Sequence, residues 1–166
     1  MGLFSFIKNA GAKVFGIGKT EEEEAAEAAA VAEEKIAMEN AKAASNMAET
    51  ISDLGLDVDD LDISIDGDVA VVAGSAHDQA TKEKVILVVG NSTGIATVDD
   101  RLTVENPEPE ARFYTVEKGD SLSKISKAMY GDPMKYPQIF EANKPMLKDV
   151  DLIYPGQVLR IPHLEK

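Results

Sequence analysis

Oxygen-bearing side chains recur at every second position near residue 64, a spacing at which calcium ligands occur. The matching residues imitate the first seven positions of an EF-hand loop and are Asp62, Ser64, Asp66, Gly67 and Asp68. Such a loop requires a glutamate at its twelfth position that binds the ion through both carboxylate oxygens, and the chain has Ala73 there. The same residues fit two alternating strands around an Asp-Gly turn. We therefore reject a calcium loop and predict a hairpin.

Side chains capable of catalysis are few and scattered. The two histidines, His77 and His163, have no nucleophile or metal ligand beside them in the sequence, and we expect both at the surface. The pair Asp99-Asp100 fits the start of a strand better than a pair of catalytic carboxylates. No glycine-rich phosphate loop precedes a helix, and the absence of cysteine excludes disulfides and thiolate metal sites. The sequence therefore predicts a protein that is not an enzyme.

The chain of 166 residues carries a formal net charge of −13. Binding to nucleic-acid phosphates needs a basic surface, so this charge argues against a nucleic-acid partner. The same charge raises the local concentration of cations. The acidic composition therefore argues against a nucleic-acid partner and favours solubility.

The first eighteen residues, MGLFSFIKNAGAKVFGIG, form an amphipathic segment with an ambiguous role. Lys8 and Lys13 interrupt the apolar run that a signal peptide needs. Phe6 stands where a myristoylation signal needs serine or threonine, and no apolar run approaches the roughly 20 residues of a membrane span. We therefore expect a cytoplasmic protein whose first segment docks on its own domain, with a position on a membrane surface as the alternative.

The first two thirds of the chain predict helix, strand, strand, helix, strand. Thr20 and Glu23 form a capping box before an alanine-rich helix that extends to about Ser52, and its acidic first half either projects into solvent or pairs with another helix. Alternation predicts strands at 61–65 and 69–73. We expect Gly74-Ser75 to open a second helix over 77–90. A third strand is expected from Gly94 to Val104.

The stretch 114–162 has its own compact pattern. A short strand at 114–116 ends in a Gly119-Asp120 turn, and Ser121 then caps a helix with apolar residues three and four apart. A second helix contains Tyr136 and Ile139. A Pro155-Gly156 turn precedes the last strand, at 158–161. The pattern predicts a two-layer βααβ unit. The whole chain is therefore expected to be α+β.

A proline-spaced polar stretch, NPEPE at 106–110, separates these two patterns. We predict a docking segment at 1–19, a first domain at 20–105, a linker at 106–112 and a second domain at 113–163.

The second domain resembles the LysM family in its YTV..GDSL..I opening, its central YGD and its IYPGQ.L.IP ending. The resemblance implies a βααβ module that often binds glycans containing N-acetylglucosamine, in a groove between the first strand–helix loop and the second helix–strand loop. The groove residues would be Gly119, Asp120, Ser121, Leu122, Asn143, Leu152 and Ile153. The same residues are also turn and core residues that any such domain needs in order to fold.

The first domain, over 32–104, resembles a BON domain in its G.V.V.G hairpin and its GI..VDD.L segment. A BON domain followed by a LysM domain, together with the N-terminal stretch and IFEANKPMLK near the end, resembles the family of small cytoplasmic potassium-binding proteins of bacteria. The departure is the acidic helix over 21–44, which is longer than the family's usual one. The resemblance implies potassium binding in the BON-containing part and compaction of the two domains on binding.

The backbone offers chemistry suited to potassium, a weakly hydrated ion that neutral carbonyl oxygens hold well. A helix that ends at Gly11 would free the carbonyls of residues 7–10, and the glycine of the 94–96 loop permits a close approach from the other side. The resemblance then implies a ligand set of backbone carbonyls, which are those of Ile7, Lys8, Ala10, Gly11, Val14 and Ile95. Rubidium, caesium or ammonium could take the place of potassium.

Three hypotheses result from the sequence. The first is a monomeric cytoplasmic potassium-binding protein that changes its domain arrangement with ion occupancy. The second is a glycan-binding or envelope-associated module that acts through its LysM groove. The third is a structural adaptor that engages a partner through the acidic helix.

Overall fold

The computed structural model describes residues 21–164. The chain forms two compact units, Met1–Lys42 and Ala43–Lys166. Its described part contains four α-helices and two small sheets, so the predicted α+β class is confirmed. The predicted docking segment and the capping residue Thr20 lie outside the described residues. Among the residues described, no helix combines the length and the apolar composition that crossing a membrane requires.

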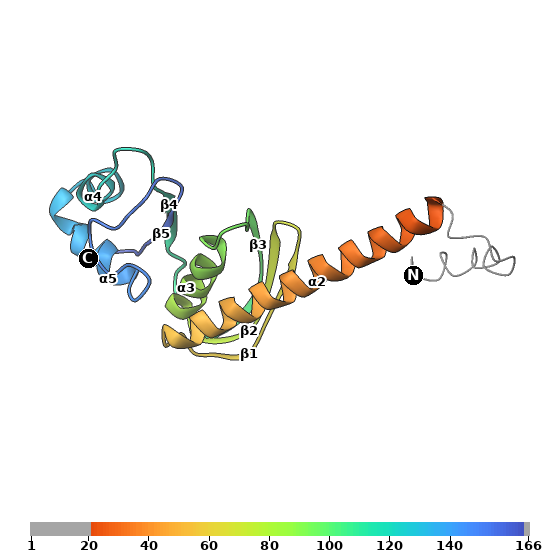
Figure 1. Ribbon diagram of the computed structural model, residues 1–166. Helices are drawn as coiled ribbons and strands as arrows, with labels where there is room; N and C mark the ends of the chain where they lie inside the picture. Colours follow the sequence, from red (N-terminus) through yellow and green to blue (C-terminus); the bar gives the residue numbers. More distant parts are fainter. Residues whose placement is uncertain (1–20, 165–166) are drawn as a thin grey trace, which may run out of the picture. The chain divides into compact units, whose positions relative to one another are not determined.

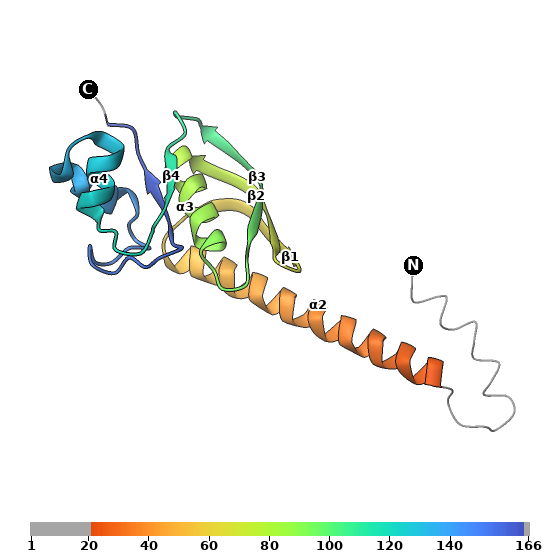
Figure 2. The same ribbon diagram turned by 90° about the horizontal axis from the view of Figure 1, so that it is seen from above.

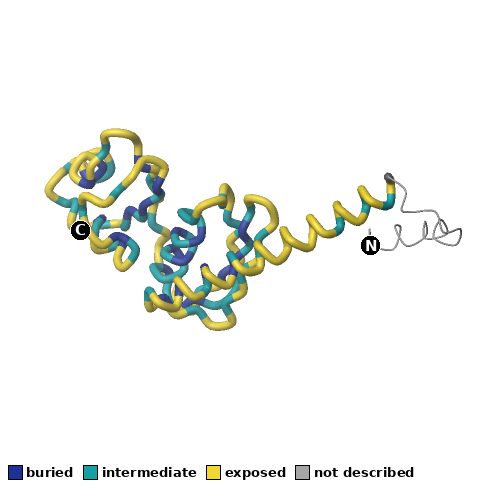
Figure 3. Tube along the Cα trace, viewed as in Figure 1, coloured by how far each residue is buried: buried dark blue, intermediate teal, exposed yellow. Residues whose placement is uncertain are grey.

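Helix α2 spans Glu21–Asp53 and is the long alanine-rich helix that the sequence predicts (Figure 1). In the first unit its side chains are mostly exposed, as the yellow stretch of Figure 3 shows, and Val31 and Met38 are 61% and 69% exposed. In the second unit the same helix buries Met47 and Ile51. Both residues belong to a core cluster, so the C-terminal part of α2 is a structural element of the second unit.

The end of α2 is set by Gly55, whose φ of 69° is a left-handed conformation. The Leu56 N–H donates to the Ile51 carbonyl over 3.1 Å, and the Gly55 N–H donates to the Ser52 carbonyl over 2.9 Å. This pair of bonds satisfies the last carbonyls of the helix. It also places Leu56 in the same core cluster as Ile51.

The three-stranded module, residues 43–106, is built on a sheet with the strand order β1-β2-β3. Strand β1 (Val58–Asp66) is antiparallel to β2 (Val69–Asp78), which is parallel to β3 (Thr97–Asn106). Helix α3 (Gln79–Gly90) connects the two parallel strands and packs against both (Figure 1, Figure 2). The buried core of this module comprises Met47, Ile51, Leu56, Ala70, Val72, Val85, Val89 and Leu102.

The predicted helix start at Gly74-Ser75 is wrong, because both residues belong to β2. Helix α3 begins after Asp78, whose side chain accepts a hydrogen bond from the Thr81 N–H at 2.7 Å. Gly74 lies opposite an irregularity of β1, where the register shifts between Asp59 and Asp62. A Cβ at Gly74 would lie 2.8 Å from the Val58 side chain and 2.9 Å from the Asp59 carbonyl, so the glycine serves a close approach of two strands. The third strand also begins later than predicted, at Thr97, since Gly94 lies in a turn.

The C-terminal module follows residues 107–111, which have no regular structure. Strand β4 (Arg112–Thr115) pairs antiparallel with β5 (Val158–Ile161). Between them lie α4 (Leu122–Tyr130), the 3₁₀ turn η2 (Pro133–Lys135) and α5 (Tyr136–Ala142). The predicted βααβ order is therefore present, with the short 3₁₀ turn as an addition. Its buried core comprises Val116, Leu122, Ile125, Ile139, Leu147, Leu159 and Ile161.

Candidate functional site

The predicted potassium ligands fall in two parts of the chain. Five of the six, Ile7, Lys8, Ala10, Gly11 and Val14, lie outside the described residues. The sixth, Ile95, lies in the turn between α3 and β3.

The turn around Ile95 is held on both sides by its N–H groups. The Ile95 N–H donates to the Ser92 carbonyl over 3.3 Å, and the N–H groups of Ala96 and Thr97 donate to the Asp68 carbonyl over 2.8 and 3.1 Å. Gly94 has a φ of 89°, and the Ile95 side chain packs against the core of the three-stranded module. Within the described chain, no hydrogen bond of this turn ends on the Ile95 carbonyl oxygen. The N–H groups of residues 95–97 are therefore all bonded within the three-stranded module.

The first loop of the predicted glycan groove is stabilised by its own polar groups. Asp120 Oδ2 accepts hydrogen bonds from the Tyr114 hydroxyl and from the Glu117 N–H, each over 2.9 Å. The bond to this carboxylate raises the pKa of Tyr114 above its usual value. The Gly119 carbonyl accepts from Lys124 Nζ at 2.7 Å. These groups hold the turn before α4 and are already engaged within it.

The remaining groove residues also have structural contacts. Ser121 caps α4 by accepting from the Lys124 N–H, and Leu122 is buried in the core. Asn143 is 2% exposed, and its side chain bonds backbone groups of Ile139 and Arg160. Leu152 is 63% exposed, whereas Ile153 packs against the core of the module.

A buried ion pair joins the two modules of the second unit, and sequence reasoning missed it. Glu83 of α3 pairs through Oε2 with Arg160 Nε of β5, and the side chains of Glu83 and Arg160 are 4% and 12% exposed. The other oxygen of Glu83 accepts from Gln79 Nε2 at 3.0 Å and from the Ala111 N–H at 2.9 Å. Burial lowers the pKa of Lys84 below its usual value, and the Arg160 charge lowers it further. Glu83 stands between Lys82 and Lys84 in the sequence, a setting typical of an exposed glutamate, so no local signal indicated its burial.

A second polar contact between the modules involves Asn91, directly after α3. Its Oδ1 accepts from the Val158 N–H at 2.8 Å, and its Nδ2 donates to the Val158 carbonyl at 2.9 Å. Met146 of the C-terminal module packs against the core of the three-stranded module. A cleft of about 430 Å³ adjoins these contacts. Its lining includes Leu54, Leu87, Asn91, Met146, Leu152 and Tyr154.

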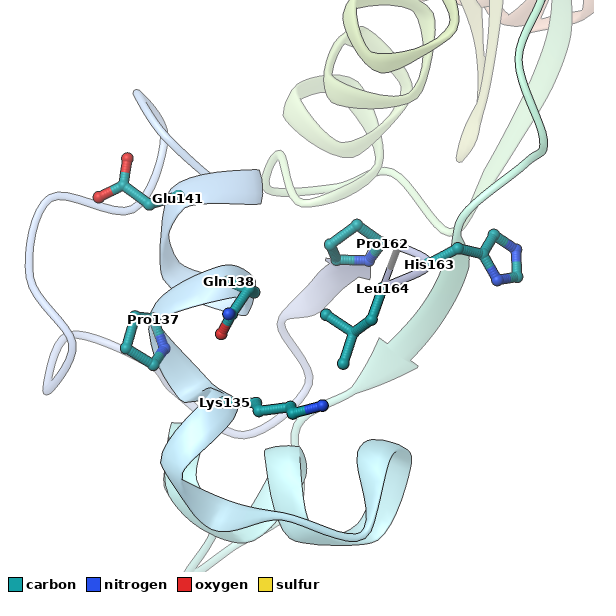
Figure 4. Close-up of a pocket in the computed structure, with 7 residues that line it drawn as sticks. All are labelled: Lys135, Pro137, Gln138, Glu141, Pro162, His163 and Leu164. Atoms are coloured by element: carbon teal, nitrogen blue, oxygen red, sulfur yellow. The ribbon is translucent and has the colours of Figure 1, made fainter. Parts of the chain in front are cut away.

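A further cavity, of about 560 Å³, lies beside α5 in the C-terminal module and is drawn in Figure 4. Lys135 and Leu164 extend toward its interior, whereas Glu141 and His163 point away from it (Figure 4). His163 Nε2 lies 2.8 Å from the Glu110 carbonyl. The other histidine, His77, lies 3.1 Å from a Glu105 carboxylate oxygen in an exposed pair. Both histidines therefore have surface contacts, as the sequence predicts.

The stability that Asp78 contributes is expected to depend on pH, because its carboxylate caps α3. The hydrogen bond from the Thr81 backbone N–H holds the pKa of Asp78 below its usual value of 3.8. A lowered folded-state pKa means that the cap stabilises the fold above the unfolded pKa and loses this effect as the pH falls through the folded value. We expect Asp78→Ala to cost about 1 kcal/mol at pH 7.

The measurement is the urea midpoint of the native chain and of the variant, at pH 7 and at about pH 3. The difference between the two proteins should shrink at the lower pH. Asp57→Ala, at an exposed position, serves as the control and should change little at either pH. An undiminished difference at low pH would contradict a charged cap.

A family model of the LysM domain matches residues 114–162, which confirms the predicted LysM resemblance. The potassium binding protein Kbp of Escherichia coli O6:H1 (strain CFT073) is 42% identical over 164 residues, which cover 98% of this chain and 99% of that protein. The chain belongs to the Kbp family. An uncharacterised protein of Deinococcus radiodurans is 55% identical over 49 residues, which cover 30% of this chain and 19% of that protein.

The Kbp relationship extends well beyond the LysM domain. Because the aligned region covers nearly the whole of both proteins, it includes the three-stranded module and the segment before it as well as the LysM domain. Among the described residues, no group of three or more histidine, aspartate or glutamate side chains is arranged to hold a metal ion.

Proposed function

We propose that this chain binds a potassium ion through uncharged backbone oxygens, and that ion occupancy strengthens the contact between its two modules. The observation that carries the proposal is the identity of 42% with potassium binding protein Kbp over nearly the full length of both chains. The net charge of −13 supports it, because an acidic protein attracts cations.

The proposed ligands are the backbone carbonyls of the N-terminal segment and of the turn at Ile95. Potassium is large and weakly hydrated, so a ring of neutral carbonyl dipoles can replace its hydration shell. The geometry of the Ile95 turn supports its role as one wall of the site, since its N–H groups are bonded to Ser92 and Asp68. The opposite wall would consist of carbonyls that belong to Ile7, Lys8, Ala10, Gly11 and Val14.

The proposal assigns a role to each segment. Residues 1–19 dock on the domain at 20–105 and complete the ion site, residues 106–112 connect the domains, and residues 113–163 form the LysM domain that closes on ion binding. The protein acts as a monomer in the cytoplasm and binds the ion without catalysing a reaction.

The test is a titration of the full chain with KCl and, at equal ionic strength, with NaCl. Potassium should raise the melting temperature by mass action and reduce the radius of gyration measured by X-ray scattering. We expect rubidium, caesium and ammonium to act as weaker or equal substitutes and sodium to have little effect. Equal responses to KCl and NaCl would overturn the proposal.

Gly94→Ala tests the turn itself, because Gly94 has a φ of 89° and a Cβ added there would meet no atom within 4 Å. An alanine there shifts the backbone next to Ile95, and we expect the KCl midpoint to rise about tenfold, equivalent to about 1.4 kcal/mol. Gly119→Ala is the matched control, since its φ is 88° with equally open space. Both variants should lose about 1 kcal/mol of stability, but the control should keep the potassium midpoint of the native chain.

The match to the LysM family supports a second candidate function, glycan binding by the C-terminal module. The internal bonds of Asp120, Gly119 and Asn143 reduce the polar groups open to a sugar. A titration with chitooligosaccharides distinguishes the two functions. Saturable binding of the sugar without any response to potassium would make glycan binding the favoured function.

A further inference from the structure

The cleft of about 430 Å³ beside α3 is lined mainly by apolar side chains of the three-stranded module and of the LysM domain. Leu87 of α3 and Leu147 are buried, and Met146 packs against the core of the three-stranded module. Leu54, which follows α2, contributes from the other side of the sequence. Of the residues predicted for the glycan groove, Leu152 alone is in the described lining, and none of the proposed ion ligands is.

Two large apolar side chains are exposed at this cleft. Leu152 is 63% exposed and Tyr154 is 49% exposed, and both belong to the lining. Single apolar side chains on a surface are ordinary, but large ones gathered at a concave apolar site are typical of ligand binding. A ligand in the cleft would remove both side chains from water, which is favourable in proportion to the area covered.

A buried amide in the lining has an unused donor. Gln157 is 9% exposed, and its Oε1 accepts from the Tyr154 N–H at 3.2 Å. Its backbone N–H donates to the Tyr154 carbonyl over 3.1 Å, and its carbonyl accepts from the Val116 N–H over 2.8 Å, so the residue is held in place. Within the described chain, Gln157 Nε2 donates to no group. No described side-chain nitrogen or oxygen both lacks a partner and is sealed from solvent, so this donor is accessible to a ligand.

The described lining contains one charged residue, Lys148. It is exposed, and it forms no ion pair within the part of the chain that the structure describes. The neighbouring Asp149 accepts from the Asp151 N–H and is not in the described lining. The net charge of −13 is spread over the whole chain, and at physiological salt charges more than about 8 Å away are largely screened. Lys148 therefore gives the cleft a positive end.

This lining does not suit the other ligands considered for the chain. A divalent cation would favour carboxylate ligands, and the described lining contains none. A sugar would bury hydroxyl groups that need partners, whereas the Asn91 amide is occupied by Val158 and the Thr50 hydroxyl donates to the Asn46 carbonyl. The two polar groups left free, an amide nitrogen and an ammonium, are donors. A ligand that accepts hydrogen bonds and carries negative charge complements them.

We propose that this cleft binds a small aliphatic monocarboxylate. Its apolar chain lies against Leu87, Leu147 and Leu152, and its carboxylate accepts a hydrogen bond from Gln157 Nε2 beside the Lys148 ammonium. Hydrogen bonds to an ionised acceptor are stronger than those between neutral groups. The volume of the cleft lies in the lower part of the range for small-ligand pockets, about 300–1,000 Å³. The site is separate from the proposed potassium function and goes beyond it.

The first test is calorimetry of the full chain with octanoate. The buffer contains both KCl and NaCl, so that the result does not depend on which cation the chain binds. We expect saturable binding at a single site. Hexanoate should bind about tenfold more weakly, because it buries less of an apolar chain. 1-Octanol should also bind about tenfold more weakly, because it lacks the charge that the two donors complement.

Two exposed positions test the site without disturbing the core. Lys148→Gln should weaken octanoate binding about tenfold, because it removes the positive charge. Lys118→Gln removes the same charge from an exposed lysine outside the described lining and should leave binding unchanged. Leu152→Ala should weaken binding about fivefold through lost apolar contact. Met134→Ala is its control, since Met134 is 75% exposed and is not in the described lining.

Gln157→Glu tests the hydrogen bond itself. The glutamate keeps an oxygen for the Tyr154 N–H but replaces the donor with a second carboxylate oxygen. Octanoate should then be repelled and bind more weakly by about tenfold or more. 1-Octanol should bind at least as well as to the native chain, because its hydroxyl can donate to the glutamate.

The proposal is overturned if octanoate gives no saturable heat with the native chain, or if 1-octanol binds as tightly as octanoate. Equal losses in Lys148→Gln and Lys118→Gln would show that binding follows net charge, and equal losses in Leu152→Ala and Met134→Ala would place the ligand elsewhere. Either result refutes the site. A loss of octanoate binding confined to Lys148→Gln, Leu152→Ala and Gln157→Glu supports it. The KCl titration reports potassium binding separately, so either proposal can fail while the other stands.

Discussion

Replacement of Asn143 by alanine is expected to lower the free energy of unfolding by about 3 kcal/mol. The Asn143 side chain is 2% exposed and donates to the Ile139 and Arg160 carbonyls at 2.7 and 2.8 Å. Its oxygen accepts from the Arg160 N–H at 2.8 Å. An alanine would leave these three backbone groups without their partner where water has poor access, and each buried unsatisfied group costs about 1–3 kcal/mol.

Urea unfolding of the full chain, followed by circular dichroism, measures this loss. Asn106→Ala is the matched control, because the same side chain there makes one exposed bond to the His77 carbonyl. We expect that control to change stability by less than about 0.5 kcal/mol. A loss below about 1 kcal/mol for Asn143→Ala would mean that water replaces the amide at β5.

The second large effect is expected at Gly74, where alanine should cost about 4 kcal/mol. The new Cβ would lie 2.8 Å from Val58 Cγ1, 2.9 Å from the Asp59 carbonyl oxygen and 3.2 Å from Leu61 Cα. Two of these atoms belong to the backbone, so strand β1 must move away from β2 to relieve the close contact. Such overpacking lowers the free energy of unfolding by about 1–3 kcal/mol. The φ of 140° adds backbone strain of about 1–2 kcal/mol for any residue with a side chain.

Gly67→Ala introduces backbone strain without overpacking, since Gly67 has a φ of 62° and a Cβ added there would meet no atom within 4 Å. It should cost about 1 kcal/mol. The measurement is again the urea midpoint, with hydrogen exchange of β1 and β2 amides to locate the damage. Equal losses in the two variants would show that the contact with β1 is relieved without cost.

Much of the fold could be predicted because the residues that begin and end its helices act locally. Ser121 caps α4, and Gly131, with a φ of 78°, ends it, as the spacing of these residues indicates. The LysM pattern was therefore recognisable, and the match over 114–162 confirms it. The long helix α2, predicted to extend to about Ser52, ends at Asp53.

The candidate site could be predicted less completely. The sequence placed Ile95 beside a glycine that permits an unusual backbone, and Gly94 does have a φ of 89°. The residues of the glycan groove were assigned from the LysM pattern, but their internal bonds, such as that between Tyr114 and Asp120, depend on side-chain positions. The assignment of ion ligands remains a prediction.

What the sequence determined by itself was the order and type of the elements, since caps, turns and periodicity act over a few neighbouring residues. The tertiary structure decided the roles of Gly74, Glu83 and Asn91. Gly74 was misassigned to a helix start because its close neighbour belongs to another strand. Glu83 bonds a residue 77 positions away and Asn91 one 67 positions away. A buried polar side chain acquires its role from the partner that satisfies it, and no local pattern specifies a partner at that distance.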